Sequence, residues 1–506
     1  MKILFLATAL LLTPWIHAAD AAKTAPPNIL FIITDDQGYG DWSTNGHPLL
    51  KTPHADKLAA ESVRLENFYV SPSCSPTRAA LLTGMHEFMS GITHTQWPRV
   101  ELPKDTTTLP ELLAKAGYRT GFVGKWHLGK FAGDHGFEWC STNQGGPREH
   151  FDPVMVRNGK KSKPTGYRED IFFDEAMQFI SQTKDEPWFL YLGTYSPHDP
   201  LAAPEEFVKP FRGKVTEEQA QYLGMVANLD YNIGRIMAFL KERGLDENTI
   251  VVLMSDNGQT YGLDVYNANM RGCKVTAWEG GMRTFSYWRW LNHWPPHQVD
   301  NLTAHLDVLP TLCAVADAKI PSGIESQLEG FNLLPILEAD GPLAWHDDRM
   351  LYHHVARWPG GMAADHKYAM AGVRQGNHLL VRSRPCDNPH CSDQNGRQCD
   401  TLRSVEEGGK KAPFTAENAQ FHWGVTPRDR WALFHVKKDP GCTNDLSTAD
   451  PQRVNAMAAA YDTWWDKTYP TMVERGGDAE ITWTQVQLDL IAKEKAAKAL
   501  KQKQTK

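Results

Sequence analysis

Short apolar runs alternate with longer amphipathic stretches before about residue 300, and this alternation constrains the fold more than any other feature. The apolar runs are rich in Ile, Val, Leu and Phe, and they predict buried strands at residues 28–34, 119–124, 188–194 and 249–254. The amphipathic stretches predict helices at residues 55–62, 108–116, 172–183 and 216–243. The pattern is typical of an α/β fold in which helices flank a large, mostly parallel central sheet.

The character of the chain changes near residue 345, where short strand-like pieces separated by turns begin. They predict a smaller antiparallel sheet from residues 351–354, 368–374, 378–382 and 431–436, closed by a helix near residues 451–467. We therefore expect a main α/β domain at 26–340, a C-terminal subdomain at 345–470 and a Lys-rich tail at 484–506. The tail predicts a solvated or frayed helix, with a basic interaction segment as the alternative.

The N-terminus has the pattern of an export signal. Lys2 precedes an apolar run at residues 3–12, and the small residues Ala18 and Ala19 follow. This pattern predicts a signal peptide at residues 1–19 and a periplasmic or secreted protein, with a buried N-terminal strand or helix as the alternative. Because no other stretch reaches the roughly 18 apolar residues that a span needs, we expect no membrane span in the mature chain.

The net charge and the cysteine content limit the binding partners and the disulfides that we expect. The formal net charge is −7, and a protein that binds nucleic acid usually has a basic excess, so we expect no nucleic-acid partner.

Cys386, Cys391 and Cys399 lie close together in a polar loop, which in an exported protein favours a local disulfide. A zinc site with His390 is the alternative, although the loop lacks a CxxC spacing. With Cys74 set apart, seven of the eight cysteines remain, so at least one stays unpaired.

Polar side chains follow each of the predicted strands of the main sheet. Since ligand sites in open parallel sheets form beyond the carboxyl ends of the strands, we expect these side chains to meet at one edge. Taken singly, each cluster is also explained by helix capping or a charged loop. The residues concerned are Asp35, Asp36, Lys125, His127, His198, Asp256 and Asn257.

Two further features indicate chemistry at that edge. Asp35, Asp36, Asp256 and Asn257 offer only hard oxygen ligands, which suit Ca²⁺ best, Mg²⁺ less well and Zn²⁺ poorly. In the segment Cys74-Ser75-Pro76-Thr77-Arg78, the Ser-Pro step predicts a helix start. Cys74 at the positive end of such a helix fits a reactive thiol, but for the pentapeptide taken alone a buried cysteine followed by an ordinary Arg is the favoured interpretation.

These segments together resemble the type I sulfatases, which are arylsulfatase A-like members of the alkaline phosphatase superfamily. Cys74-x-Pro76-x-Arg78 followed by Leu82-Thr83-Gly84 is similar to the family signature for a cysteine oxidised to formylglycine. Further matches, in the family's order, lie at residues 35–40, 124–129, 196–198, 256–258, 274, 278–283 and 433–440. Departures are few: Cys273 replaces a more usual Gly, and residues 288–290 are bulky.

The resemblance implies a mechanism for cleaving a sulfate ester. Residue 74 is expected to be converted to formylglycine by a maturation enzyme that acts before folding. The cation is expected to be held by residue 74 together with Asp35, Asp36, Asp256 and Asn257. One hydroxyl of the aldehyde hydrate attacks sulfur, and the second allows the covalent intermediate to collapse.

The resemblance also assigns the remaining charged residues. Lys125 and Lys274 are expected to stabilise the sulfuryl oxygens, and Arg78 to hold the hydrate. His198 is the expected general acid, with Lys274 as a second candidate, and His127 is expected to accept the proton of the second hydroxyl.

The expected substrate is a small-molecule or oligosaccharide sulfate ester, and a sulfated carbohydrate is the first choice. An arylsulfatase, a phosphate or phosphonate monoester hydrolase on the same scaffold, and an inactive secreted carbohydrate-binding protein are the alternatives. Six residues lie in segments that could rim the pocket, although packing also explains them: Trp97, Arg99, His353, His354, Arg357 and Trp358.

Overall fold

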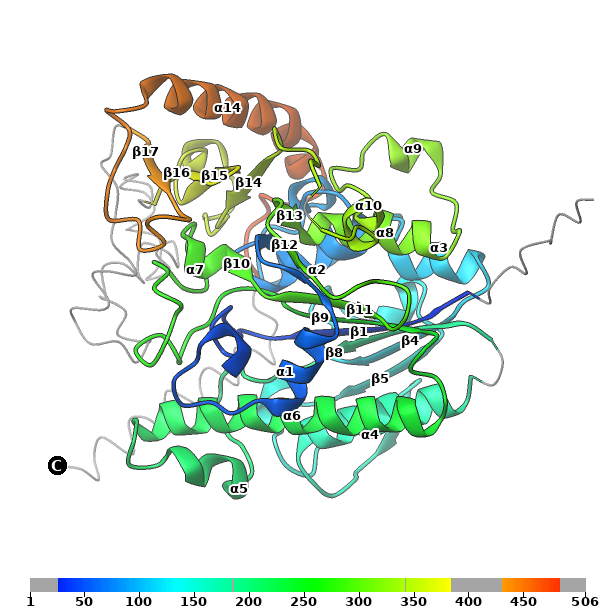
Figure 1. Ribbon diagram of the computed structural model, residues 1–506. Coiled ribbons are helices and arrows are strands. Elements are labelled where there is room, and N and C mark those ends of the chain that lie inside the picture. Colours follow the sequence, from blue (N-terminus) through cyan, green and yellow to red (C-terminus); the bar gives the residue numbers. More distant parts are fainter. Residues whose placement is uncertain (1–25, 184–185, 342, 384–429, 483–506) are drawn as a thin grey trace, which may run out of the picture.

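The computed structural model describes residues 26–183, 186–341, 343–383 and 430–482 (Figure 1). A ten-stranded sheet runs through the centre of the molecule. Its strands, in spatial order, are β12 (Gln298–Val299), β2 (Val63–Leu65), β11 (Ser286–Trp290), β9 (Thr249–Ser255), β1 (Asn28–Thr34), β8 (Trp188–Gly193), β4 (Arg119–Gly124), β5 (Trp139–Asn143), β6 (Met155–Arg157) and β7 (Lys160–Ser162).

The middle of this sheet is parallel, as the sequence predicts. β1 pairs in parallel with β8 on one side and β9 on the other, and β4 continues the parallel run to β5. β11, β6 and β7 are antiparallel additions nearer the edges. The residues of β1, β8 and β9 are all buried, which explains why these strands appear in the sequence as continuous apolar runs.

Helices cover both faces of the sheet (Figure 1). The long helices α4 (Arg168–Ser181) and α6 (Glu217–Glu242) pack on one face with α1 (Pro53–Ala60), where Leu30 and Ile32 of β1 point. The opposite face, where Ile29 and Phe31 point, is covered by α2 (Cys74–Thr83), α3 (Leu109–Lys115) and α8 (Val308–Val315). Short helices complete the main body: α5 (Glu205–Val208), α7 (Glu279–Met282), α9 (Ser322–Glu325) and α10 (Leu334–Leu337).

Two smaller sheets follow. A three-stranded sheet joins β10 (Arg283–Thr284), β3 (Phe68–Tyr69) and β13 (Thr303–Ala304). The second is an antiparallel four-stranded sheet of β14 (Met350–His354), β15 (Ala371–Gln375), β16 (His378–Arg382) and β17 (Ala432–His435). Helix α14 (Pro451–Glu474) packs over it (Figure 1). The predicted fold class, a large mostly parallel sheet with a smaller antiparallel sheet and helix, is therefore confirmed.

Several predicted boundaries were wrong. The predicted strand at 368–374 begins only at Ala371, because Tyr368 packs its ring against Trp431 and Tyr461 instead of joining the ladder. α14 continues through Pro470 to Glu474, seven residues beyond the predicted end at 467. The domain division remains a prediction.

Some sequence-based expectations lie outside the described residues: the signal peptide at 1–19, the loop with Cys386, Cys391 and Cys399, and the tail at 484–506. The five cysteines within the described part, Cys74, Cys140, Cys273, Cys313 and Cys442, are free thiols. No helix in the described ranges combines the length and apolarity needed to cross a membrane.

A buried ion pair joins the four-stranded sheet to the main body, and it predicts a large stability effect. Arg349, just before β14, donates 2.7 Å hydrogen bonds from both terminal nitrogens to the two carboxylate oxygens of Asp307. Arg349→Ala leaves that buried carboxylate without its cation, so we expect a loss of roughly 3–5 kcal/mol in the free energy of unfolding. Urea titration measures it.

The exposed pair of Arg475 with Asp105 is the matched control. Arg475→Ala is expected to change stability by no more than about 1 kcal/mol. Equal effects of the two substitutions would contradict a structural role for the buried pair.

Candidate active site

The strand ends of the main sheet bring seven predicted residues to one edge. Asp35 and Asp36 follow β1, Lys125 and His127 follow β4, His198 follows β8, and Asp256 and Asn257 follow β9. Lys274 reaches the same edge from the loop after β9, where its neighbour Val275 donates a 2.8 Å backbone hydrogen bond to Pro72. That bond ties the Lys274 loop to the segment that leads into α2 and residue 74.

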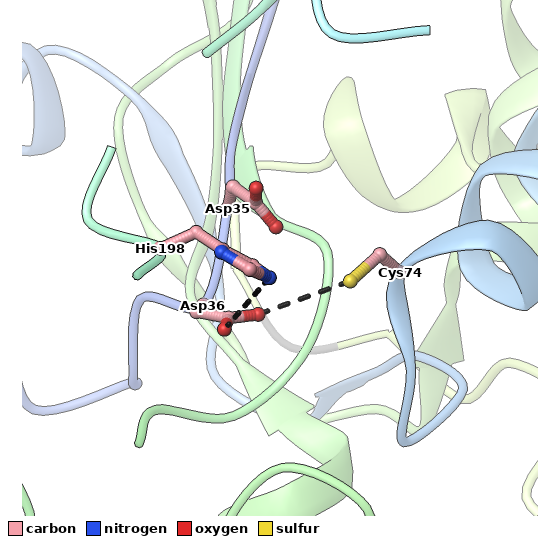
Figure 2. Close-up of side chains that lie close together, drawn as sticks. All are labelled: Asp35, Asp36, Cys74 and His198. Carbon is pink, nitrogen blue, oxygen red and sulfur yellow. Dashed lines mark hydrogen bonds and ion pairs between the residues drawn. The ribbon is translucent and has the colours of Figure 1, made fainter. Parts of the chain in front are cut away.

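Asp36 lies at the centre of the cluster. Its carboxylate accepts hydrogen bonds from Lys274 Nζ at 2.8 Å and Asn257 Nδ2 at 2.9 Å, and its backbone N–H donates to Asp256 Oδ1 at 3.2 Å. The His198 Nε2 atom is 3.7 Å from Asp36 Oδ2 (Figure 2). Asp36 therefore contacts residues from three separate segments of the chain.

Asp35 and Asp256 extend the cluster around Asp36. The Lys125 ammonium lies 2.5 Å from Asp35 Oδ2. Arg78 donates to Asp256 Oδ2 from Nε at 3.0 Å and from Nη2 at 2.8 Å. Burial alone would raise the pKa of Asp35, but the charges of Lys125, His198, Arg78 and Lys274 hold it well below its ordinary value. Asp35 is thus a carboxylate, kept ionised by its cationic neighbours.

This donor set fits a divalent cation. Asp35, Asp36, Cys74 and His198 each place a ligand atom within 4.8 Å of the others, and Asp256 and Asn257 contact Asp36 directly. The Asp35 Oδ1 and Asn257 Oδ1 atoms are buried without a hydrogen-bond partner among the described residues. Buried oxygens without a donor are what a hard cation binds, so the residues present suit Ca²⁺ or Mg²⁺.

The backbone of Asp36 is held in an unusual conformation. Its φ of 63° is in the left-handed region, which is strained for a residue other than Gly. Tyr222 of α6 donates from its hydroxyl to the Asp36 carbonyl at 3.2 Å and to Asp41 Oδ2 at 2.6 Å. Gly38 N–H donates to the same Asp41 oxygen at 2.7 Å. Tyr222 and Asp41 therefore stabilise the turn that presents Asp36, and no sequence pattern predicted this support.

Residue 74 faces the cluster from the first turn of α2. The helix begins at Cys74, one residue earlier than the Ser-Pro step predicts, and Cys74 Sγ lies 3.9 Å from Asp36 Oδ1 (Figure 2). Burial raises the pKa of the Cys74 thiol to about 12 despite the charges of Lys125 and Lys274. The desolvation of the fully buried sulfur outweighs the effect of the helix terminus, so the unmodified side chain is a neutral thiol, as in the alternative of a buried cysteine.

Arg78 supports the cluster from the next turn of α2. Besides its bonds to Asp256, it donates from Nη1 to the Lys125 carbonyl at 2.8 Å. The guanidinium is fully buried. Its hydrogen bonds thus connect α2 to the ends of β4 and β9 and fix the distance between residue 74 and the carboxylates.

The two histidines have different surroundings. His127 is partly buried, and its Nε2 atom lies 3.3 Å from the Thr95 carbonyl. Burial, followed by the charge of Lys125, lowers the pKa of His127 well below its ordinary value, so the ring is neutral. His198 is 22% exposed, and its Nδ1 atom contacts the Asp199 carboxylate at 3.2 Å.

The six pocket-rim candidates separate into two groups. Arg99, His353, His354 and Trp358 are buried, so packing explains them. Trp97 and Arg357 are partly exposed, and Arg357 contacts Ser73. The sequence did not single out Ser73, His94 or Tyr222, because nothing in the local pattern marks residues whose partners lie on distant segments.

Comparison with known proteins identifies the class. The family model described as "Sulfatase" matches residues 27–318, so the chain belongs to the sulfatase family. It is 32% identical over 62% of its length to mouse arylsulfatase J, 35% over 62% to human N-acetylgalactosamine-6-sulfatase and 32% over 64% to human arylsulfatase A. These alignments span 56%, 66% and 70% of the respective relatives. The resemblance to arylsulfatase A-like type I sulfatases is thereby confirmed.

Solved structures agree with the fold. Ps i-CgsB in complex with k-i-k-neocarrahexaose is similar with a TM-score of 0.70 and 25% identity, over 90% of this chain and 94% of that one. The PsFucS1 sulfatase from Pseudoalteromonas sp. gives a TM-score of 0.67 at 20% identity, over 90% and 92%. The fold therefore matches over nearly the whole length of both solved chains.

The buried carboxyl group of Asp41, which supports the Asp36 turn, predicts a pH-dependent stability of the fold. Burial raises the pKa of Asp41 from its ordinary value of 3.8 to about 7, although its hydrogen bonds from Tyr222 and Gly38 lower it in part. The folded protein therefore holds this proton more tightly than the unfolded chain. The resulting stability is fully present below about pH 4 and is lost as the pH rises towards 7.

Asp41→Asn removes this titration and keeps an oxygen that accepts both hydrogen bonds. We expect the variant's melting temperature, relative to the parent protein, to increase between pH 5 and pH 8 in calcium-containing buffer. Differential scanning calorimetry at both pH values measures it, with the exposed Asp347→Asn as control. A difference between variant and parent that does not change with pH would contradict the shifted pKa.

Proposed function

We propose that this protein hydrolyses sulfate esters of carbohydrates with residue 74, oxidised to formylglycine, as the nucleophile. The observation that carries the proposal is the position of residue 74 at the start of α2, facing a buried carboxylate cluster and two lysines. Family membership and the names of the curated relatives support the reaction class.

Ca²⁺ is the proposed cation, with Mg²⁺ as the less suitable one. Asp35, Asp36, Asp256 and Asn257 would hold it with residue 74, because they supply buried hard oxygens in excess of their hydrogen-bond donors. When bound, a divalent cation lowers the pKa of a hydroxyl group and offsets negative charge on the substrate.

An aldehyde hydrate fits position 74 better than the thiol. A buried thiol with a pKa of about 12 supplies almost no thiolate at neutral pH. One hydroxyl of a hydrated formylglycine can attack sulfur, and the other can lose its proton to expel sulfate and restore the aldehyde. This chemistry requires a formylglycine-generating maturation enzyme as a partner before the chain folds.

The lysines neutralise the substrate. A sulfate ester is anionic, and its oxygens repel a nucleophile unless positive charge lies close to them. Lys125 and Lys274 are held at the cluster by ion pairs with Asp35 and Asp36, and they are placed to bind the sulfuryl oxygens. Preorganised charge of this type stabilises the charge that develops in the transition state.

The histidines take the proton-transfer roles. His198 lies beside Asp36 and its side chain is partly exposed, so we assign it the general acid for the departing alcohol. His127 is neutral and its Nδ1 atom has no hydrogen-bond partner among the described residues, so it is able to accept a proton. Arg78 positions the nucleophile through Asp256 and the Lys125 backbone.

A cavity beside His127 suits a sugar. It has a volume of about 420 Å³, within the range of small-molecule sites, and its walls include Trp126, Phe131 and Tyr195. Aromatic rings pack well on sugar faces, and Asn143 and Gln144 add polar groups to the same walls. A sulfated carbohydrate is also what an exported sulfatase of this type would meet, which fits the signal peptide predicted at residues 1–19.

The proposed role of residue 74 as the nucleophile predicts the effect of replacing Cys74. Cys74→Ala is expected to fold, to bind divalent cation and to lose at least about a thousandfold in turnover of N-acetylgalactosamine 6-sulfate. Cys313→Ala, which alters another buried free thiol, is expected to retain turnover. Sulfate release measures both, and mass spectrometry of the peptide around residue 74 from the native host reports the aldehyde. Full activity of Cys74→Ala, or faster turnover of a matched phosphate ester, would overturn the proposal.

The proposed cation site predicts the effect of removing divalent ions. Removing divalent ions with EDTA is expected to abolish turnover and to lower the melting temperature, because the buried carboxylates lose a stabilising charge. Ca²⁺ is expected to restore both, and Mg²⁺ to restore them less fully. Calorimetric titration of Ca²⁺ into the Cys74→Ala and Asp36→Asn variants gives a readout independent of turnover, with weaker binding expected for Asp36→Asn. Binding that is unchanged in Asp36→Asn would exclude Asp36 as a ligand.

A further inference from the structure

The hairpin of β6 and β7 contributes a wall to the cavity beside His127. Val156 of β6 and Gly159 of the turn line this cavity. Asn158 and Gly159 have φ values of 45° and 79°, the left-handed conformation of a tight Asn-Gly hairpin turn. The Asn158 N–H donates to the Cys140 carbonyl at 2.9 Å, and Asn158 Oδ1 accepts from the Cys140 N–H at 2.7 Å. Because Cys140 also lines the cavity, these bonds fix the hairpin relative to it.

The strand register places Lys161 of β7 in line with the end of β4. Thr142 of β5 pairs with Val156, and Val156 pairs with Lys161. Thr142 Oγ1 donates to the carbonyl of Gly124, the residue before Lys125, at 2.7 Å. Residues directly opposite in a ladder point to the same face, so Lys161 lies on the cavity side of the sheet beside Val156. Three strand spacings separate its backbone from Gly124 by about 14 Å, which is more than one sugar ring spans.

Two ammonium groups at this cavity have no carboxylate partner among the described residues. Lys161 is exposed and Lys130 lines the cavity, and neither forms an ion pair within the described ranges. Lys130 Nζ lies over the Trp97 ring, 5.1 Å from its centroid, a cation–π contact that holds the ammonium without neutralising it. The described residues that line the cavity include no Asp or Glu. An anion that enters therefore meets positive charge without a competing carboxylate on the walls.

An exposed aromatic ring accompanies these charges. Phe131 is 47% exposed and lines the cavity next to Lys130. Its ring packs against Gly133, where a Cβ atom would come within 2.3 Å of it. An aromatic face binds the apolar face of a sugar, and an ammonium binds an anionic substituent. The combination therefore fits an anionic sugar better than a neutral one.

The two lysines of β7 provide an internal comparison. Lysines on an edge strand also discourage pairing with another chain, and that role would apply equally to Lys160 and Lys161. Lys160, however, pairs with Arg157, whose Nε atom donates to Glu175 of α4 at 2.7 Å, on the other face of the sheet. Lys160 and Lys161 are thus equally exposed neighbours on opposite faces, and only Lys161 shares its face with the cavity.

We propose that this cavity and the β6–β7 hairpin bind a second, anionic sugar of the substrate, with Phe131 against its ring and with Lys130 and Lys161 on its sulfate or carboxylate groups. The proposal deepens the function above and rests on it. It assigns the substrate class as sulfated oligosaccharides that carry repeated negative charges, in place of single sulfated sugars.

Binding to the inactive Cys74→Ala protein tests this without turnover. The probes are N-acetylgalactosamine 6-sulfate and a chondroitin 6-sulfate tetrasaccharide whose non-reducing end is that sugar, titrated by calorimetry in calcium buffer. We expect the tetrasaccharide to bind about tenfold more tightly, because two exposed charge pairs of about threefold each are added. This affinity ratio is expected to fall between about 50 and 200 mM NaCl, since salt screens exposed charges. A carboxyl-reduced tetrasaccharide distinguishes the two anions: it keeps the ratio where sulfate is bound and loses it where carboxylate is bound.

Substitutions in the same background locate the second sugar. Lys130→Gln and Lys161→Gln are each expected to lower the affinity ratio about threefold, and Lys161→Glu to lower it further. Lys161→Arg keeps the charge and is expected to keep the ratio. Lys160→Gln removes an equal charge from the opposite face of the same strand and is the matched control, with no change expected.

The outcomes are distinct. Equal affinities for the two sugars, no binding of either, or a ratio that survives both Lys130→Gln and Lys161→Gln would each overturn the proposal. A Lys160→Gln variant that lowers the ratio as much as Lys161→Gln would also overturn it, because the effect would then come from general surface charge. Failure of the proposed function shows separately, as the expected affinity ratio in a formylglycine-containing protein that releases no sulfate from either sugar.

Discussion

The buried charge balance at the end of β1 is the constraint on which the site depends. Three fully buried carboxylates, Asp35, Asp36 and Asp256, are ion-paired with three cations, Lys125, Lys274 and Arg78. Isolated charges of this type cannot be buried, since desolvation of each is costly unless a partner offsets it. A divalent cation bound to this balanced set would give the site an excess of positive charge. An anionic ester, together with the loss of one proton from the site, would offset that excess. The same arrangement disfavours a neutral ligand.

Much of the fold could be predicted because the main strands are buried on both faces. β1 and β4 have the predicted bounds, since a continuous apolar run ends where the chain leaves the sheet. Prediction was poorer where tertiary packing decides the structure. Tyr368 lies in an aromatic cluster outside its predicted strand, and Pro470 lies inside a helix that the sequence pattern ended earlier. The positions of Tyr368 and Pro470 do not follow from the local secondary-structure preferences of these residues alone.

The same distinction applies to the site. Residues that follow strands could be placed together from the sequence, because the carboxyl ends of parallel strands share an edge. Cys74 could be located but its state could not, since the pKa of its thiol depends on burial that only the folded chain creates. Tyr222 and Arg99 act through backbone carbonyls of distant segments. Such contacts leave no trace in residue spacing, so supporting residues are the part of a site that sequence patterns miss.

Exposure increases outward through the site, and this gradient separates the roles of its groups. The carboxylates at the base are fully buried, and their charges are fixed by partners, so they suit a permanent cation. His127 is partly buried and neutral, which suits the proposed proton acceptor. The His198 side chain is 22% exposed, which suits the proposed general acid, because a departing alcohol must reach solvent.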